Sequence, residues 1–323
     1  MKISRTCLTA AIAALALVAA GRPAAALDKF TVAAPQKGFW DTAFPYLGQE
    51  KGFFKEQGIE LDIQWTEGGA DTQQAVITGS IDIGLATGLL GVLSAYAKGA
   101  PVMLASSEMT GASDLYWYVK ADSPIKSLAD LEGKTVAYSR PGSSSNTIAA
   151  ALVKLSGKNA KLVSAGGAPA TLTQVMSGQI DVGWSAVPIN LNLVDEKKIR
   201  VLALGNDAPG AADQTVRVNI TNADVYKNRH EALKRFFVAY QKSIDWAYSG
   251  NDVPEMYGKF AGVSPSVVEQ LRTKFTPKPA VALNRMSGLD VTMREAVEAK
   301  RLAAPLTPDQ QKGLLAPMKD LNP

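Results

Sequence analysis

A run of serines at the start of a predicted helix is the clearest candidate binding feature in this chain. The segment 138–157 reads YSRPGSSSNTIAAALVKLSG, in which Gly142, which lets backbone approach, precedes the four polar residues Ser143, Ser144, Ser145 and Asn146. A helix N-terminus has unpaired N–H groups and a partial positive charge, so it attracts anions. Helix capping, the alternative role, needs only one such side chain. Because four polar residues exceed that need, we predict an oxyanion-binding site here.

Two basic residues stand beside predicted loops. Arg140 precedes the serine run and would bind a carboxylate or sulfonate through two parallel hydrogen bonds. A surface position beside Pro141 is an equally good interpretation of this residue. Lys37 has a similar place after the first predicted strand and is the weaker candidate.

Two tryptophans are predicted to enclose the apolar part of a ligand. Trp40 lies in a glycine-flanked loop after the first predicted strand, and Trp184 ends a later one. Facing aromatic rings would hold a planar or apolar ligand between them. A core position is the alternative, and the pattern favours it for Trp184 taken alone. The other tryptophans are predicted to pack in the core or at a hinge: Trp65, Trp117 and Trp246.

Small residues follow two of the predicted strands. They would allow backbone amides to approach a ligand, although tight turns explain them equally well. The candidates are Gly68, Gly69, Thr87 and Gly88. Asp82 and Asp181 each precede a predicted strand, and we interpret them as structural anchors, not as an acid–base pair.

The residues needed for enzyme catalysis are scarce. The single cysteine is Cys7, and the single histidine, His230, falls in an amphipathic helical pattern where we expect it to face solvent. The chain has no G-x-S-x-G turn, phosphate-binding loop or His/Cys metal-ligand cluster. We therefore predict a binding protein that is not an enzyme, without catalytic residues, metal or cofactor.

Residues 1–26 have the organisation of a signal peptide. Lys2 and Arg5 precede the apolar run 8–20, which is short for a membrane span, and Ala24–Ala26 forms a small-residue cleavage pattern. An uncleaved anchor is the alternative. Removal of these residues lowers the net charge from +4 to about +1, because three basic residues and no acid are lost. A nearly neutral chain argues against a nucleic-acid partner.

A repeat of 99 residues organises the rest of the chain. TQQAVITGSIDIGLATG (72–88) aligns without gaps with TLTQVMSGQIDVGWSAV (171–187), and TVAAPQKG (31–38) is similar to TVAYSRPG (135–142). Each copy has the order strand, polar loop, helix, strand, polar loop. Strands that alternate with helices indicate mostly parallel sheets, which bind ligands at the carboxyl ends of their strands. We therefore predict two similar α/β lobes.

The last third of the chain is helical and has no counterpart after the first copy. We expect it to pack back on the first lobe, with the β-patterned segments 115–120 and 216–221 as the two crossings. The predicted boundaries are 27–115 for the first part of lobe 1, 116–220 for lobe 2 and 221–323 for the return to lobe 1.

Several phrases together resemble the periplasmic solute-binding proteins of ABC importers. They are GFWDTAFPYLGQEKGFFKEQGIELDI, GSIDIGLAT, YVKADSPIKSLADLEGKTVAY, PGSSSN and GQIDVGWSAVP. They are most similar to the branch that handles nitrate, aliphatic sulfonates, taurine and thiamine-precursor pyrimidines. The resemblance extends from about Phe30 to the final helices, and none of these phrases is specific for one ligand.

The resemblance implies a type II periplasmic binding protein fold with the ligand in a cleft between the lobes. It implies that the serine run and Trp184 face this cleft. It also implies a periplasmic, monomeric protein that delivers its ligand to a permease with a cytoplasmic ATPase. We expect a small organic anion (a sulfonate or carboxylate), then a pyrimidine-type heterocycle, then an inorganic oxyanion. A same-fold enzyme of cofactor-precursor biosynthesis and a sensory binding protein are the alternatives.

Overall fold

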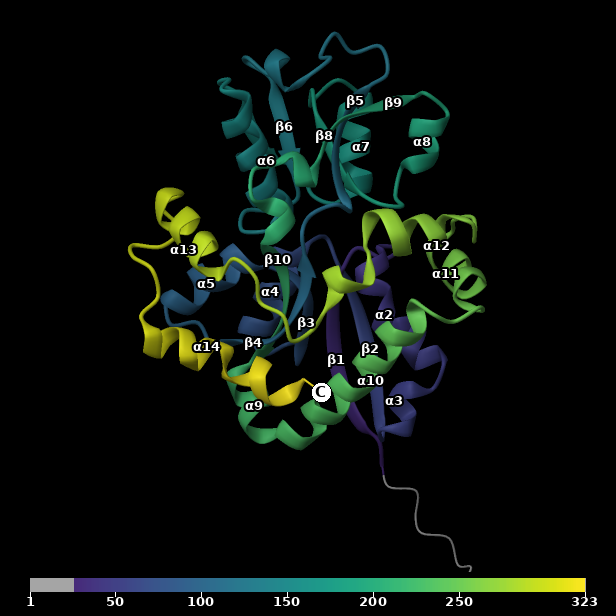
Figure 1. Ribbon diagram of the computed structural model, residues 1–323, viewed down its shortest axis with the longest axis vertical. Coiled ribbons are helices and arrows are strands. Elements are labelled where there is room, and N and C mark those ends of the chain that lie inside the picture. The colour runs from purple at the N-terminus through teal and green to yellow at the C-terminus, as the bar shows by residue number, and fades with distance from the viewer. Residues whose placement is uncertain (1–25, 323) are drawn as a thin grey trace, which may run out of the picture.

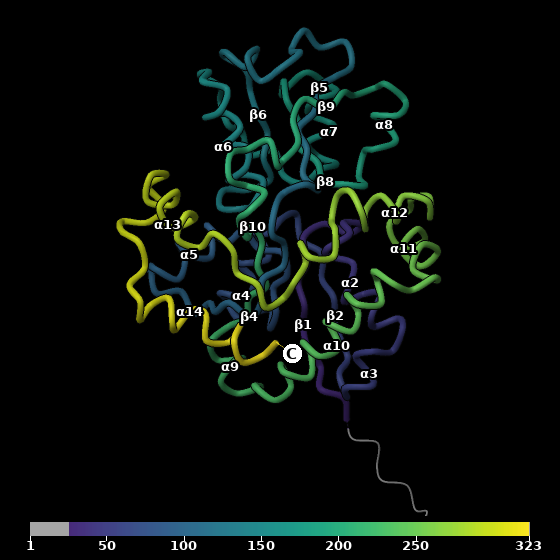
Figure 2. Tube along the Cα trace, viewed as in Figure 1, coloured from purple at the N-terminus to yellow at the C-terminus, as the bar shows by residue number. Residues whose placement is uncertain are grey.

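Two α/β lobes stacked along the long axis of the molecule form the computed structural model, which describes residues 26–322 (Figure 1). The predicted signal peptide, apart from its last residue, lies outside the described residues, as does Cys7. The chain passes from the lower lobe to the upper one before β5 and returns before β10 (Figure 2).

The lower lobe contains a five-stranded sheet. Its strands, in spatial order, are β2 (Ile59–Thr66), β1 (Asp28–Pro35), β3 (Ile83–Gly88), β10 (Thr215–Asn222) and β4 (Val102–Thr110). β1 pairs in parallel with β2 and β3, whereas β10 is antiparallel to both of its neighbours. The helices between these strands are α2 (Trp40–Glu50), α3 (Phe53–Glu56), α4 (Gly69–Ile77) and α5 (Leu89–Ala97).

The upper lobe repeats this strand order with shorter strands. β6 (Thr135–Tyr138) is parallel to β7 (Lys161–Ser164), and a bridge from Val136 to Val182 joins β6 to the segment before β8. β5 (Leu115–Lys120) is antiparallel to β8 (Gly183–Ala186) and β9 (Ile199–Leu204). The order β7-β6-β8-β5-β9 therefore matches β2-β1-β3-β10-β4. Its helices are α6 (Ser144–Ser156), α7 (Ala168–Met176) and α8 (Leu191–Asp195).

The two lobes also share one side-chain anchor. In the lower lobe, the backbone N–H and hydroxyl of Thr31 donate to Asp82 Oδ2 at 2.9 and 3.1 Å. In the upper lobe, Thr135 makes the same two hydrogen bonds to Asp181 at 2.9 and 2.8 Å. The predicted repeat and the structural role of both aspartates are confirmed. The two-lobed periplasmic binding protein fold is likewise confirmed.

The crossing strands differ slightly from their predicted positions. β10 begins at Thr215 and is hydrogen-bonded in the lower sheet, so the chain is back in the first lobe before the predicted boundary at residue 220. The reason is that the segment 215–222 forms one continuous buried strand. The helices that follow are α9 (Ala223–Asn228), α10 (His230–Ala247), α11 (Val253–Ala261), α12 (Val267–Gln270), α13 (Leu289–Glu298) and α14 (Pro308–Leu321).

The helical tail covers the lower sheet. α10 packs on α2 and α3, and α14 packs on β4. One face of α10 is fully buried through Leu233, Phe236, Phe237, Tyr240, Ile244 and Ala247. Burial of this apolar stripe is the main stabilising contribution of the helix. Among residues 26–322, no helix combines the length and apolarity that a membrane crossing requires.

Candidate ligand-binding cleft

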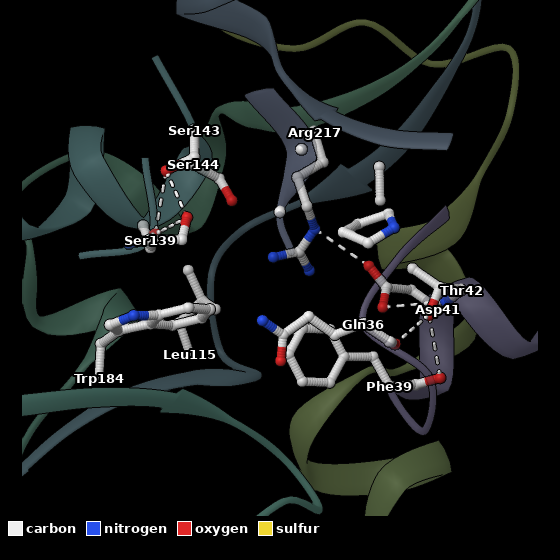
Figure 3. A pocket seen from close by; sticks show the side chains of 15 residues that line it. Gln36, Phe39, Asp41, Thr42, Leu115, Ser139, Ser143, Ser144, Trp184 and Arg217 are labelled. Atoms are coloured by element: carbon white, nitrogen blue, oxygen red, sulfur yellow. Dashed lines mark hydrogen bonds and ion pairs between the residues drawn. The ribbon is translucent and has the colours of Figure 1, made fainter. Parts of the chain in front are cut away.

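A small cavity of about 30 Å³ lies between the two lobes. The lower lobe contributes the segments that follow β1 and β2, the end of β3, and β10. The upper lobe contributes the end of β6, the start of α6 and β8. The side chains that meet there include Gln36, Phe39, Asp41, Ser144, Trp184 and Arg217 (Figure 3). As predicted from the parallel strands, the cavity is at their carboxyl ends.

Arg217 on β10 is the basic side chain of the cavity wall. It is 5% exposed, and its Nη2 donates to Asp114 Oδ2 at 2.7 Å. Its Nε lies 3.0 Å from Asp41 Oδ2, an ion pair in which the N–H is not aligned on that oxygen. Figure 3 shows the guanidinium between Asp41 on one side and the serines with Trp184 on the other. The two carboxylates hold the pKa of Arg217 above its usual value despite burial, so it remains a cation.

Two residues of the cavity wall have a strained backbone. Gln36 and Ala86 both adopt φ of +49°, a left-handed conformation that costs about 1–3 kcal/mol outside glycine. The side chain of Gln36 then extends from the lower lobe to the upper one. Its Nε2 donates to the Glu67 carbonyl at 2.8 Å, and its Oε1 accepts from the Ala168 N–H at 3.1 Å. Strained backbone at this position therefore supports an interlobe contact.

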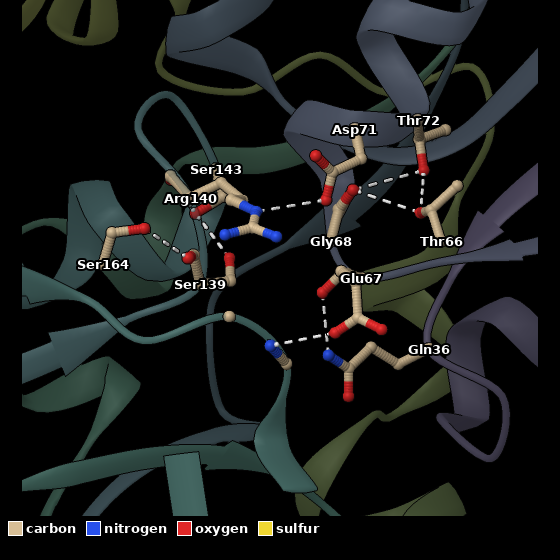
Figure 4. Close-up of polar contacts among 12 residues, drawn as sticks. Gln36, Thr66, Glu67, Gly68, Asp71, Thr72, Ser139, Arg140, Ser143 and Ser164 are labelled. Carbon is tan, nitrogen blue, oxygen red and sulfur yellow. Dashed lines mark hydrogen bonds and ion pairs between the residues drawn. The ribbon is translucent and has the colours of Figure 1, made fainter. Parts of the chain in front are cut away.

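Glu67 adds a second hydrogen bond at the same place. Its Oε2 accepts from the backbone N–H of Gly167 at 3.3 Å, at the start of α7 (Figure 4). A carboxylate is favourable there because a helix N-terminus is partially positive. Gly167 has no space for a side chain, since an added Cβ would lie 2.2 Å from Gln36 Nε2. Gln36 and Glu67 thus connect the lower lobe to α7 of the upper lobe.

The serine run has a mixed role. Ser143 caps α6 by accepting from the Asn146 N–H, and Ser145 accepts from the Ser139 N–H at 3.0 Å. The hydroxyls of Ser139, Ser143 and Ser145 also bond to one another at 2.9–3.0 Å. Ser144 also lines the cavity, and none of the hydrogen bonds found within residues 26–322 uses its hydroxyl. Two of the three serines therefore hold the β6–α6 turn, and Ser144 is available to a ligand.

We expect mutation to distinguish the structural role of Ser143 from the binding role of Ser144. Ser143→Ala should lower the free energy of unfolding by about 1 kcal/mol, the usual cost of removing a helix cap. Ser144→Ala should leave stability unchanged and weaken anion binding by about 10-fold through the loss of one charge-assisted hydrogen bond. Chemical denaturation and calorimetry measure the two quantities. Equal behaviour of the two variants would contradict this division of roles.

The tryptophans do not form the predicted sandwich. Trp184 lines the cavity, and its indole N–H donates to the Gly166 carbonyl at 3.2 Å, so its ring forms an apolar wall. Trp40 is 1% exposed, donates to the Tyr248 hydroxyl at 3.0 Å and packs edge-on against Phe44 and Tyr257. The prediction for Trp40 is wrong because α2 begins at this residue and turns the indole into the core. Phe39, one residue earlier, faces the cavity instead.

Some of the other predicted site residues line the cavity, and the rest lie beside it. Thr87 is buried and donates to the Val218 carbonyl at 2.9 Å, whereas Gly68 and Gly69 do line the cavity. Arg140 is half-exposed, and its Nε lies 3.5 Å from Asp71 of the lower lobe. Gly142 N–H donates to Asn146 Oδ1 at 3.1 Å. Arg140, Gly142 and Asn146 thus serve the turn and the interlobe contact.

Gly88 and Gly91 bring the two lobes into direct backbone contact. A Cβ added at either residue would lie 2.5 Å from the carbonyl oxygen of Gly142. α5 of the lower lobe therefore meets the turn before α6 of the upper lobe at a distance that only glycine permits. The predicted role of Gly88 as a backbone donor to the ligand is replaced by a role in lobe contact.

Sequence reasoning missed most of the polar cavity residues. They are Gln36, Asp41, Thr42, Ser139 and Arg217, together with the apolar Phe39 and Leu115. One signal was present, because Arg217 is a charged residue inside a β-patterned crossing segment. A charge in a buried strand is rare unless it is paired, so it marks a functional or paired position.

The cavity is suited to binding. Its lining contains no histidine or cysteine, and its one carboxylate, Asp41, is paired with Arg217. In the part of the chain that the structure describes, no group of three His, Cys, Asp or Glu side chains has metal-binding geometry. A guanidinium, a free hydroxyl and a helix N-terminus around an apolar wall favour an anionic ligand with an organic body.

Comparison with protein families matches residues 40–252 to the family described as NMT1/THI5 like. Among curated proteins, the THI5 4-amino-5-hydroxymethyl-2-methylpyrimidine phosphate synthase of Saccharomyces cerevisiae is 30% identical over 93 residues. This match covers 29% of the chain and 27% of the yeast protein. The chain therefore spans about a quarter of the length of the curated relatives that it matches.

Solved structures share the fold at low sequence identity. The alkanesulfonate-binding protein SsuA from Xanthomonas axonopodis pv. citri, bound to MOPS, has a TM-score of 0.73 at 18% identity, covering 93% of this chain and 99% of that one. The desulfurization enzyme DSZB has a TM-score of 0.61 at 17% identity, covering 88% and 95%. The fold thus occurs in a binding protein and in an enzyme.

Proposed function

Because this chain belongs to the NMT1/THI5-like family, we propose that it is the solute-binding component of an ABC-type importer. It captures a small organic anion, a sulfonate or carboxylate, in the cleft between its lobes. It then presents the closed form to a membrane permease. The predicted signal peptide supports a periplasmic location, and we propose that the protein acts there as a monomer.

One observation carries this proposal. Arg217 belongs to the lower lobe, the Ser144 hydroxyl and the N-terminus of α6 belong to the upper lobe, and all of them border the same cavity. An anion held between them would interact with both lobes at once. Such a ligand stabilises the closed arrangement by the difference between its binding free energies for the closed and the open arrangement. The ring of Trp184 and the side chain of Phe39 would contact its apolar part.

A ligand panel tests the proposal. The purified protein is titrated with an alkanesulfonate, an arenesulfonate, a carboxylate, an aminopyrimidine and nitrate, and unfolding temperature and binding heat are measured. We expect a sulfonate or carboxylate to bind with a dissociation constant of micromolar order, about −8 kcal/mol. Binding of the pyrimidine alone, or of none of the anions, would contradict the assigned ligand class.

A synthase activity is the second candidate, favoured by the match to the yeast pyrimidine phosphate synthases. Mass spectrometry of the ligand recovered after incubation distinguishes it from transport. A transport protein returns the ligand unaltered, and we expect this result because the cavity lining lacks cysteine and histidine. Turnover that scales with protein concentration would overturn the binding role.

A further inference from the structure

The carboxyl groups around Arg217 outnumber its single positive charge. Asp41, Glu108 and Asp114 are each at most 5% exposed, and Asp41 and Asp114 are in direct contact with the guanidinium. Oδ1 of Asp114 has no hydrogen-bond donor within residues 26–322. If all three were ionised, two negative charges would remain uncompensated in the interior, which is strongly unfavourable. Such a cluster has a high affinity for protons.

Glu108 lies behind the cavity wall and is connected to it. The Tyr240 hydroxyl on α10 is 3.0 Å from both of its carboxyl oxygens, and Asn219 on β10 donates to Oε2. The side-chain oxygen of Asn219 accepts from the backbone N–H of Ala86, a residue of the cavity wall, at 3.0 Å. Burial, followed by the charge of Asp41, raises the pKa of Glu108 to about 8.

The groups that face Asp41 from the neighbouring elements do not neutralise this excess. Arg217 comes from β10, Glu108 from β4 and Asp114 from the segment after β4. The others are the hydroxyls of Tyr240 from α10, Tyr248 just after α10 and Tyr257 from α11. Burial raises the pKa of each of these tyrosines, so all remain neutral. Burial also raises the pKa of Asp41, although Arg217 opposes the change. Arg217 is therefore the sole cation in this set.

We propose that the cleft takes up a proton together with its anionic ligand, on the buried carboxyl pair of Asp41 and Glu108. This inference rests on the proposed function, because it needs an anion beside Arg217. The anion brings one more negative charge to a cluster that already has too many, and a proton from solvent compensates it. The carboxyl pair thereby limits the total negative charge of the ligands that the cleft accepts.

The pH dependence follows from linkage. Above pH 8, Glu108 is ionised in the unliganded protein, and an anion favours its protonated form. Affinity for an anion that does not itself titrate should therefore rise by about 10-fold from pH 9 to pH 7. Just below pH 7 the affinity should level off, because Glu108 is then protonated in both states.

Calorimetry with ethanesulfonate and benzenesulfonate tests the proposal on the wild-type protein. Titrations at pH 8 in Tris and in triethanolamine, which differ in ionisation enthalpy, give the number of protons taken up. We expect about half a proton per ligand at this pH. Equal heats in both buffers, with affinity unchanged from pH 7 to pH 9, would overturn the proposal even if the anions bind. Absence of binding at every pH would instead overturn the proposed function and, with it, this inference.

The variant Glu108→Gln tests whether Glu108 is the residue that takes up the proton. Glu108→Gln keeps a neutral side chain of the same shape, so its affinity at pH 9 should equal that of the wild type at pH 7. Asp62→Asn, at an exposed position on β2, is the matched control and should keep the wild-type pH dependence. A Glu108→Gln protein with the wild-type pH profile would remove Glu108 from the proposal. If this variant does not fold, the wild-type measurement in two buffers decides.

Discussion

The Arg217→Met variant should lose about 100-fold or more in affinity for a sulfonate and about 3–5 kcal/mol in the free energy of unfolding. The affinity falls because the cavity loses its guanidinium. The stability falls because Asp41 and Asp114 are then buried without their cation, and Asp114 has no other hydrogen-bond donor for Oδ2 among the described residues. Calorimetry and urea denaturation measure the two losses.

Two further variants make this result interpretable. Arg217→Lys retains the positive charge and should fold. Lysine lacks the planar guanidinium that contacts two carboxylates and a ligand at once, so affinity should fall by about 10-fold. Arg140→Met is the matched control, because Arg140 is half-exposed and pairs with Asp71 at the edge of the lobe contact. We expect less than a threefold change for this exposed pair. A larger effect at Arg140 than at Arg217 would identify Arg140 as the anion ligand.

Closure should depend on two glycines. Gly88→Ala places a methyl group 2.5 Å from the Gly142 carbonyl oxygen and 2.8 Å from the Ser144 nitrogen, so the lobes cannot reach their observed contact. We expect affinity to fall by about 10- to 100-fold. The radius of gyration measured by X-ray scattering with saturating ligand should stay at the unliganded value.

Gly91→Ala separates closure from folding stability. Gly91 lies inside α5, where alanine is favoured over glycine by about 1 kcal/mol, yet its added Cβ would also lie 2.5 Å from the Gly142 carbonyl oxygen. This variant should therefore unfold at the same or a higher temperature while binding more weakly. Weaker binding with an equally large loss of stability would indicate a general packing defect instead of a block to closure.

The local pattern of the chain was sufficient to predict its architecture. The predicted crossing segment 115–120 is β5, and β10 covers the predicted crossing segment 216–221. The repeated Thr–Asp anchor and the buried face of α10 could also be predicted from the sequence, because strand alternation and helical periodicity are local properties that burial reinforces. The resemblance identified the type II order of the strands.

The direction of individual side chains was decided by tertiary structure. Residue type made Trp40 and Arg140 better candidates than Phe39 and Arg217, yet the start of α2 directs Trp40 into the core, and Asp71 pairs with Arg140. The serines could not be ranked either, because all three border the cavity and only the structure shows that the hydroxyls of Ser143 and Ser145 are hydrogen-bonded within the turn.

The sequence by itself determined that this protein has two related α/β lobes with small polar residues at the ends of parallel strands. Only the tertiary structure decided that the charge of the cleft comes from Arg217. This residue is 176 positions after Asp41 in the chain, yet its Nε lies 3.0 Å from Asp41 Oδ2. The physical reason is that an electrostatic site depends on distances between charges, and folding brings together Asp41, Asp114 and Arg217 from separate segments.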